Sequence, residues 1–207
     1  MLFRKILTVS GNQPNNFGTI LVIDVQPEYL DSIYFSIPEM LTFLQEQWEK
    51  PNSDVVFLYN GYESLGMIEE DELKSFYDEQ IDYSEEYTVI SDAPYFDKGY
   101  AYFRSCMDSG FADDEIVPFV RYMYNMNIND SRDIDWESLQ EKLSPELVEF
   151  LEEEREVLII PDLMTRLEEI WGPITLIGGG LSACLKEVEI ALMALGKDYQ
   201  IYRKFVY

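Results

Sequence analysis

Thr19-Ile20-Leu21-Val22-Ile23-Asp24-Val25 is the stretch that decides the fold, because it is a continuous apolar run rich in β-branched residues. Gly18 precedes the run, and Pro27 follows it closely. Such runs are typical of strands that are buried on both faces, as they are in parallel sheets. The stretch therefore predicts a parallel strand in an α/β domain.

A helix and a second strand are predicted to follow this run. Ser36 and Glu39 fit a capping box at the start of a helix, and apolar residues then keep a helical spacing as far as Trp48. The segment 54–61 predicts another buried strand. Strand, helix and strand in this order predict a βαβ unit with a right-handed crossover.

The same alternation returns near the end of the sequence. Residues 174–177 and 199–206 predict strands, and residues 182–195 predict a helix between them. Gly196 is the expected stop of that helix. Residues 157–160 predict one more strand.

These elements predict a three-layer Rossmann-like α/β fold with a mainly parallel central sheet flanked by helices. Residues 1–207 contain no repeat and no low-complexity linker, which favours a single domain. The region of about 104–156 has helical patterns and is predicted to be a helical insertion in that domain. Asp24 and Gly178 are expected at the carboxyl ends of adjacent parallel strands, where open sheets bind ligands.

The sequence is strongly acidic, with 40 Asp and Glu against 15 Lys and Arg and a formal net charge of −25. Such a charge repels phosphate backbones and anionic lipids, so we expect neither nucleic acid nor a membrane as a partner. Solubility or adaptation to a salty cytoplasm explains the charge most simply, because the acidic residues are spread along the chain. Mimicry of nucleic acid and attraction of basic partners are the alternatives.

Composition also bears on location and on cofactors. Two cysteines, Cys106 and Cys184, are too few for a disulfide framework, and no segment resembles a signal peptide or a membrane span. We expect a cytoplasmic protein, in the host cytoplasm if the gene is viral, since the composition fits a viral or a halophilic source. The sequence contains no His, the commonest metal ligand, and we expect no cofactor.

Two charged residues stand in apolar surroundings. Asp24 interrupts the first strand near its carboxyl end, where an ionised carboxylate has to be partnered or functional. Its structural alternative is the cap of a nearby loop. Lys98 lies among aromatic residues, where lost solvation makes an ammonium group useful. Its structural alternative is a surface lysine paired with Asp97.

Gly178-Gly179-Gly180-Leu181-Ser182-Ala183-Cys184 predicts a strand-to-helix turn with a cysteine in the first turn of the helix. A helix N-terminus favours the nucleophilic thiolate, and backbone N–H groups beside it can hold an oxyanion. Two other interpretations stay open. The cysteine can be a small buried residue that packs the helix on the sheet, or the glycines can bind a phosphate, although they match no complete fingerprint.

These motifs together resemble the isochorismatase-like cysteine hydrolases, the superfamily of nicotinamidases and N-carbamoyl amide hydrolases. Asp24 and Gln26 match the family's strand that ends in Asp-x-Gln-Asn-Asp-Phe, whereas residues 27–29 differ from it. Cys184 keeps the family's spacing, with Gly178 six residues before it and Gly196 twelve residues after it.

The resemblance implies hydrolysis of a C–N bond in a small carbonyl or amide substrate. Cys184 would be the nucleophile, Asp24 its general base, and Lys98 the residue that holds both charges in register. The resemblance also implies a homo-oligomer and a cis peptide between the paired glycines. It further implies a set of residues that bind the substrate or its oxyanion, namely Gly179, Gly180, Ala183, Gln26 and Tyr100.

Some features differ from the family pattern and leave alternatives open. The separation of Lys98 and Cys184 is longer than is usual in the family. If residues 157–160 were the third strand of the sheet, the lysine position would fall near Glu156. The histidine metal site of nicotinamidases is absent. The main alternative function is a catalytically inactive relative that acts as an acidic binding protein, and the third is a nucleotide-binding module.

Overall fold

The computed structural model describes residues 7–8, 17–61, 67–81, 87–99, 103–128, 133–153 and 163–207. Tyr100 and the predicted strand at 157–160 lie outside the described residues. The chain divides into two compact units. The first consists of residues 1–99, 170–186 and 198–207, and the second consists of residues 100–169 and 187–197.

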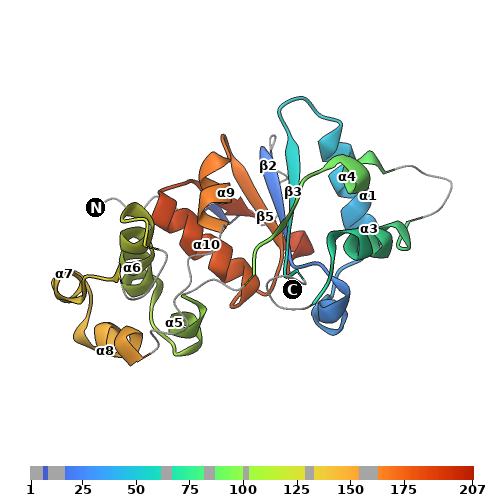
Figure 1. Ribbon diagram of the computed structural model, residues 1–207. Coiled ribbons are helices and arrows are strands. Elements are labelled where there is room, and N and C mark those ends of the chain that lie inside the picture. Colours follow the sequence, from blue (N-terminus) through green and yellow to red (C-terminus); the bar gives the residue numbers. More distant parts are fainter. Residues whose placement is uncertain are drawn as a thin grey trace. The chain divides into compact units, whose positions relative to one another are not determined.

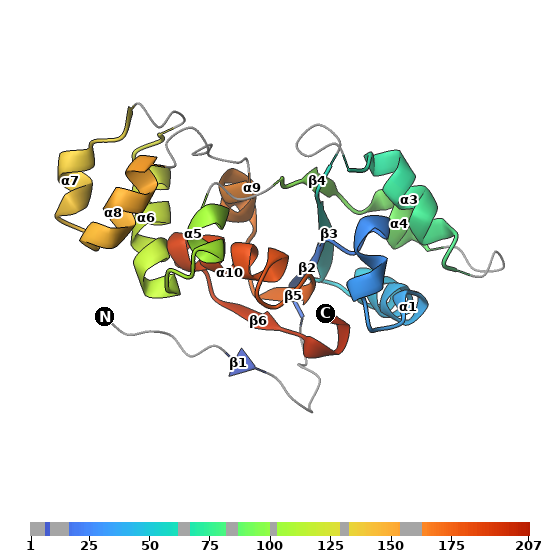
Figure 2. The same cartoon turned by 90° about the horizontal axis from the view of Figure 1, so that it is seen from below.

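The first unit contains a parallel sheet, which confirms the predicted α/β fold (Figure 1). Among the described residues its strands have the order β1-β6-β5-β2-β3-β4, and each neighbouring pair is parallel. Figure 2 shows the short β1 beside β6 at one edge. The strands are β1 (Leu7–Thr8), β2 (Thr19–Ile23), β3 (Asp54–Tyr59), β4 (Tyr95–Asp97), β5 (Ile174–Gly178) and β6 (Tyr199–Ile201).

Counted from β2, the order of the sheet is 3-2-1-4-5, as in doubly wound folds. Such a sheet has a switch point between its first and fourth strands, which are β2 and β5 here. The register pairs Ile23 with Gly178, so both strands end at the same level. The predicted placement of Asp24 and Gly178 at the carboxyl ends of adjacent parallel strands is confirmed.

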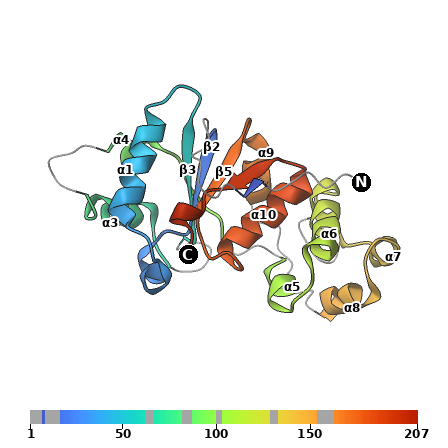
Figure 3. The same ribbon diagram turned by 180° about the vertical axis from the view of Figure 1, so that it is seen from behind.

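Three helices of the first unit pack on one face of β2 and β3 (Figures 1 and 3). They are α1 (Ile37–Trp48), α3 (Glu70–Asp78) and α4 (Thr88–Asp92). Helix α1 begins as predicted, because the Ser36 side chain accepts a hydrogen bond from the Glu39 amide. Large side chains that are under 2% exposed fill the space between these layers, including Met40, Leu44, Phe57, Leu73 and Tyr77.

Strand β3 ends at Tyr59, two residues before its predicted end, and three other predicted boundaries were wrong for local reasons. Strand β2 ends at Ile23, because Asp24 has a φ of 49° and leaves the extended conformation. Helix α10 (Cys184–Leu195) begins two residues later than predicted, because a turn occupies residues 181–183. Strand β6 ends at Ile201, and the short 3-10 helix η4 (Arg203–Phe205) follows it. A second 3-10 helix, η1 (Pro27–Ser32), follows β2.

The described residues of the second unit are mainly helical. Helix α6 (Asp113–Asn125) lies within the predicted helical insertion, and three acidic residues in its first turn stabilise it by interacting with the positive end of the helix dipole. Arg121 donates hydrogen bonds to the carbonyls of Met193 and Ala194 at the end of α10. The helices before α10 are α5 (Arg104–Asp108), α6 (Asp113–Asn125), α7 (Trp136–Gln140), α8 (Pro145–Glu153) and α9 (Leu163–Glu169).

Candidate functional site

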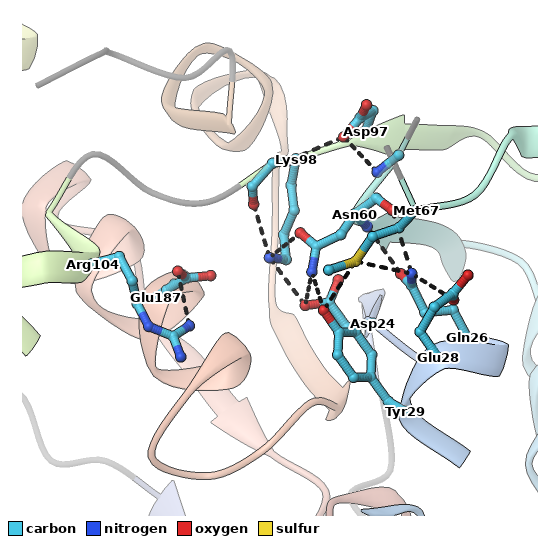
Figure 4. Close-up of polar contacts among 12 residues, drawn as sticks. Asp24, Gln26, Glu28, Tyr29, Asn60, Met67, Asp97, Lys98, Arg104 and Glu187 are labelled. Carbon is cyan, nitrogen blue, oxygen red and sulfur yellow. Dashed lines mark hydrogen bonds and ion pairs between the residues drawn. The ribbon is translucent and has the colours of Figure 1, made fainter. Parts of the chain in front are cut away.

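Polar residues follow three neighbouring strands of the first unit at one edge of the sheet. Asp24 follows β2, Asn60 follows β3, and Lys98 follows β4. Because these strands are parallel and adjacent, their carboxyl ends bring the three side chains together (Figure 4). β4 is thus the third strand counted from β2. The alternative that places the lysine position near Glu156 is therefore not needed.

Asp24 and Lys98 form a buried ion pair. The Lys98 ammonium lies 3.0 Å from Oδ2 of Asp24, and both side chains have an exposed fraction of 0%. This is the contact that the sequence predicts. Each charge favours the ionised form of the other, which offsets part of the cost of removing both from water. The alternative interpretation, in which Lys98 is a surface lysine, is wrong.

Asn60 connects the two charged side chains by hydrogen bonds, and no prediction from the sequence included it. Its Oδ1 accepts a hydrogen bond from the Lys98 ammonium at 3.0 Å, and its Nδ2 donates to Asp24 Oδ2 at 3.1 Å. Nδ2 also donates to the hydroxyl of Tyr29 at 2.9 Å, and that hydroxyl contacts the sulfur of Met67. A polar residue directly after a buried strand was the signal that could have found it, as it found Asp24.

Gln26 holds the Asn60 backbone in place. Its Oε1 accepts from the Asn60 amide at 2.9 Å, while its Nε2 donates to the Asn60 carbonyl and to Glu28. The residue is 0% exposed. Gln26 thus supports the polar cluster, and the contact with a substrate or its oxyanion that the family resemblance implies for it stays a prediction.

Asp97 fixes the backbone after β3 and the backbone directly after Lys98. One of its carboxylate oxygens accepts from the amides of Gly61 at 2.8 Å and of Gly99 at 3.1 Å (Figure 4). A Cβ on Gly61 would lie 2.2 Å from the other oxygen, so glycine is required there. The Lys98 ammonium also donates to the Gly99 carbonyl at 3.1 Å. These contacts leave Lys98 a narrow range of positions.

The backbone at the carboxyl ends of β2 and β5 is strained and closely packed. Asp24 has a φ of 49°, and its amide is held by the Leu58 carbonyl at 2.8 Å. Non-glycine residues in this conformation cost about 1–3 kcal/mol and persist where the surroundings fix them, often at functional sites. On β5, Gly178 has a φ of 72°, and a Cβ there would lie 2.3 Å from the Ile23 carbonyl oxygen.

Cys184 is the first residue of α10 and is 7% exposed. The loop that precedes it closes on itself, because the Gly180 carbonyl accepts from the amides of Ala183 at 3.0 Å and Leu185 at 3.2 Å. The predicted oxyanion donor Ala183 is thus engaged in the turn in this conformation. The expected cis peptide is wrong, since the peptide between Gly179 and Gly180 is trans.

The structure brings Asp24 and Lys98 together and places the Cys184 loop after the strand adjacent to that of Asp24. Among the described residues, no group of three or more carboxylate or thiol side chains is arranged to hold a metal ion. In the same residues, no helix has the length and apolar character needed to cross a bilayer. At this edge of the sheet the described residues provide a thiol, a carboxylate and an ammonium group.

Comparisons with family models, with curated proteins and with solved structures found no match to this chain. The fold and the polar cluster therefore stand on the structure alone.

Proposed function

We propose that the protein is a cysteine hydrolase that cleaves a C–N bond of a small carbonyl or amide substrate. The observation that carries this proposal is the buried pair of Asp24 and Lys98 at the switch point of the sheet. The strand adjacent to that of Asp24 leads directly into Cys184 at a helix N-terminus. An ion pair removed from water in this position is costly, and function is a reason to retain it.

In the proposed reaction Asp24 accepts the thiol proton of Cys184, and the thiolate attacks the carbonyl carbon. The C–N bond breaks, the proton passes from Asp24 to the leaving nitrogen, and a thioester remains on Cys184. Water then attacks the thioester, with Asp24 again as the base, and releases the acid and the thiol. Lys98 and Asn60 keep the Asp24 carboxylate ionised and oriented between these steps.

Alkylation of the thiols tests the proposal without knowledge of the substrate. Iodoacetamide should modify Cys184 at neutral pH on the order of tenfold faster than a free thiol, because an ordinary thiol is only a few per cent ionised there. Cys106 is 0% exposed and should react only when the chain unfolds, so it reports on the integrity of the fold. Mass spectrometry of the two peptides gives both rates.

An Asp24→Asn variant should slow the modification of Cys184, because the base is lost. Asp31→Asn is the matched control, since it removes one negative charge from an exposed position in η1 and should leave the rate unchanged. A Cys184 rate equal to that of a free thiol in the native chain, or equal slowing by both variants, would contradict the proposal.

A second candidate is a catalytically inactive relative that binds a partner. Two observations favour it: the side chains of Asp24 and Lys98 have no exposed surface, and the Ala183 amide is engaged within its own turn. An unreactive Cys184 in a folded chain would select this candidate. The acidic surface would then be the feature that recognises a basic partner.

A further inference from the structure

We infer that Tyr207 is a positioning residue of the site, which holds the loop of Asp24 and the loop of Cys184 in one geometry. This inference rests on the proposed function and adds a residue that no motif in the sequence indicates. The last strand and η4 return the chain to the carboxyl edge of the sheet, where the C mark lies near β2 and β5 (Figure 3).

Three hydrogen bonds join Tyr207 to the two loops. Its hydroxyl donates to the backbone carbonyl of Asp24 at 2.9 Å. Its amide donates to the Gly179 carbonyl at 3.3 Å, and its own carbonyl accepts from the Leu181 amide at 3.1 Å. The first bond fixes the residue after β2, and the other two fix the loop after β5. One residue thus spans the switch point between them.

The surroundings of the phenol agree with this position. Burial raises the pKa of Tyr207 above its usual value, and the negative charges of Asp24 and Cys184 raise this pKa further. The hydroxyl is therefore a neutral donor across the physiological range. It also lies within electrostatic reach of both groups that the proposed reaction couples.

The bond to Asp24 acts where the backbone needs support. Asp24 holds a left-handed conformation that a non-glycine residue adopts only at a cost. Its amide is fixed by Leu58 and its carbonyl by Tyr207, so both sides of the strained residue are held. Removal of the hydroxyl frees the carbonyl side and lets the Asp24 carboxylate move relative to the Cys184 loop.

Tyr207→Phe tests the inference, because it removes the hydroxyl and keeps the ring and both backbone bonds. Alkylation of Cys184 should slow by roughly threefold to tenfold, the effect of one lost hydrogen bond. The ultraviolet absorbance of the Cys184 thiolate, taken as the difference from Cys184→Ser, should fall in parallel. Tyr202→Phe is the matched control, because the Tyr202 ring packs against Phe17, Phe43 and Phe205 in the same segment.

A double-mutant cycle separates positioning from a general loss of structure. In an Asp24→Asn background Tyr207→Phe should have little further effect, because the base that it positions is already absent. A full additional loss in that background, or an unchanged rate in the single variant, would overturn the inference. If native Cys184 reacts as a free thiol, the proposed function fails and the inference with it. If Asp24→Asn slows alkylation and Tyr207→Phe does not, only the inference fails.

The native chain offers a test that needs no variant. The Leu181 amide should exchange slowly with solvent, although Leu181 is 43% exposed, because it donates to the Tyr207 carbonyl. Exchange at the rate of an open loop would show that Tyr207 does not hold the Cys184 loop, and the inference would be wrong.

Discussion

At the scale of single residues, the site depends on the side-chain amide of Asn60, which forms hydrogen bonds with both charged groups. Asn60 has one acceptor and one donor group, and it turns the acceptor to the ammonium of Lys98 and the donor to the carboxylate of Asp24. This orientation turns each amide atom to the charge of opposite sign, so it stabilises the ionised pair. Gln26 holds the Asn60 backbone at two points and keeps the amide in place.

Lys98→Met should destabilise the fold by about 3–5 kcal/mol, because it leaves the Asp24 carboxylate buried without its counter-charge. Denaturant unfolding measures this change. Lys204→Met is the matched control, since its ion pair with Glu39 is exposed and should contribute under about 1 kcal/mol. Adding Asp24→Asn to Lys98→Met should recover part of the loss, and a purely additive double variant would contradict the coupling.

At the scale of elements, the close approach of β2 and β5 sets the geometry of the site. The two strands are paired in register along their whole length, so the residues that leave them start from fixed points. A side chain on Gly178 would clash with the Ile23 carbonyl and with the Val25 side chain. Glycine is thus required by the space available as well as by its φ.

Gly178→Ala should cost about 2–5 kcal/mol of unfolding free energy, because it adds a clash to an unfavourable backbone conformation. Gly172→Ala is the control, because Gly172 has a φ of 90° and a Cβ at that position would meet no atom within 4 Å. The control should lose only about 1–2 kcal/mol of unfolding free energy, because only the unfavourable backbone conformation contributes. Equal losses in the two variants would show that the strands can separate at Gly178.

At the scale of the whole molecule, the net charge of −25 opposes compaction. Salt screens such repulsion, since the Debye length falls from about 30 Å at 0.01 M to about 8 Å at 0.15 M. The tyrosine groups add a further charge effect at high pH. Burial raises the pKa values of Tyr77 and Tyr95 in the folded chain, so stability falls as the pH rises from the ordinary tyrosine pKa of the unfolded chain toward these raised values.

Thermal unfolding should shift to a higher temperature as NaCl is added at neutral pH, by about 2–4 °C for each kcal/mol of repulsion removed. A variant that carries Glu46→Gln, Asp78→Asn and Glu79→Gln, all at exposed positions, should respond less to salt because it repels itself less. A midpoint that does not change with salt in the native chain would show that the acidic surface carries no net cost for folding.

The local chemistry of the sequence determined the central strands, the helices α1 and α10 and two members of the polar cluster. Continuous apolar runs predicted β2, β3 and β5, because strands buried on both faces need apolar side chains at every position. The place of Asp24 near the end of an apolar run and the place of Lys98 among aromatic residues marked these two charges, because a buried charge requires a partner.

Only the tertiary structure decided how these residues meet. The order of strands placed β4 beside β3, which brought Lys98 to Asp24 and put Asn60 between them. It also returned Tyr207 to the loops after β2 and β5, 183 positions along the chain from Asp24. No local pattern encodes such contacts, because they depend on pairing between strands that are far apart in the sequence. An apolar run shows that a strand is buried, but hydrophobic burial is non-directional and does not specify which strand lies beside it.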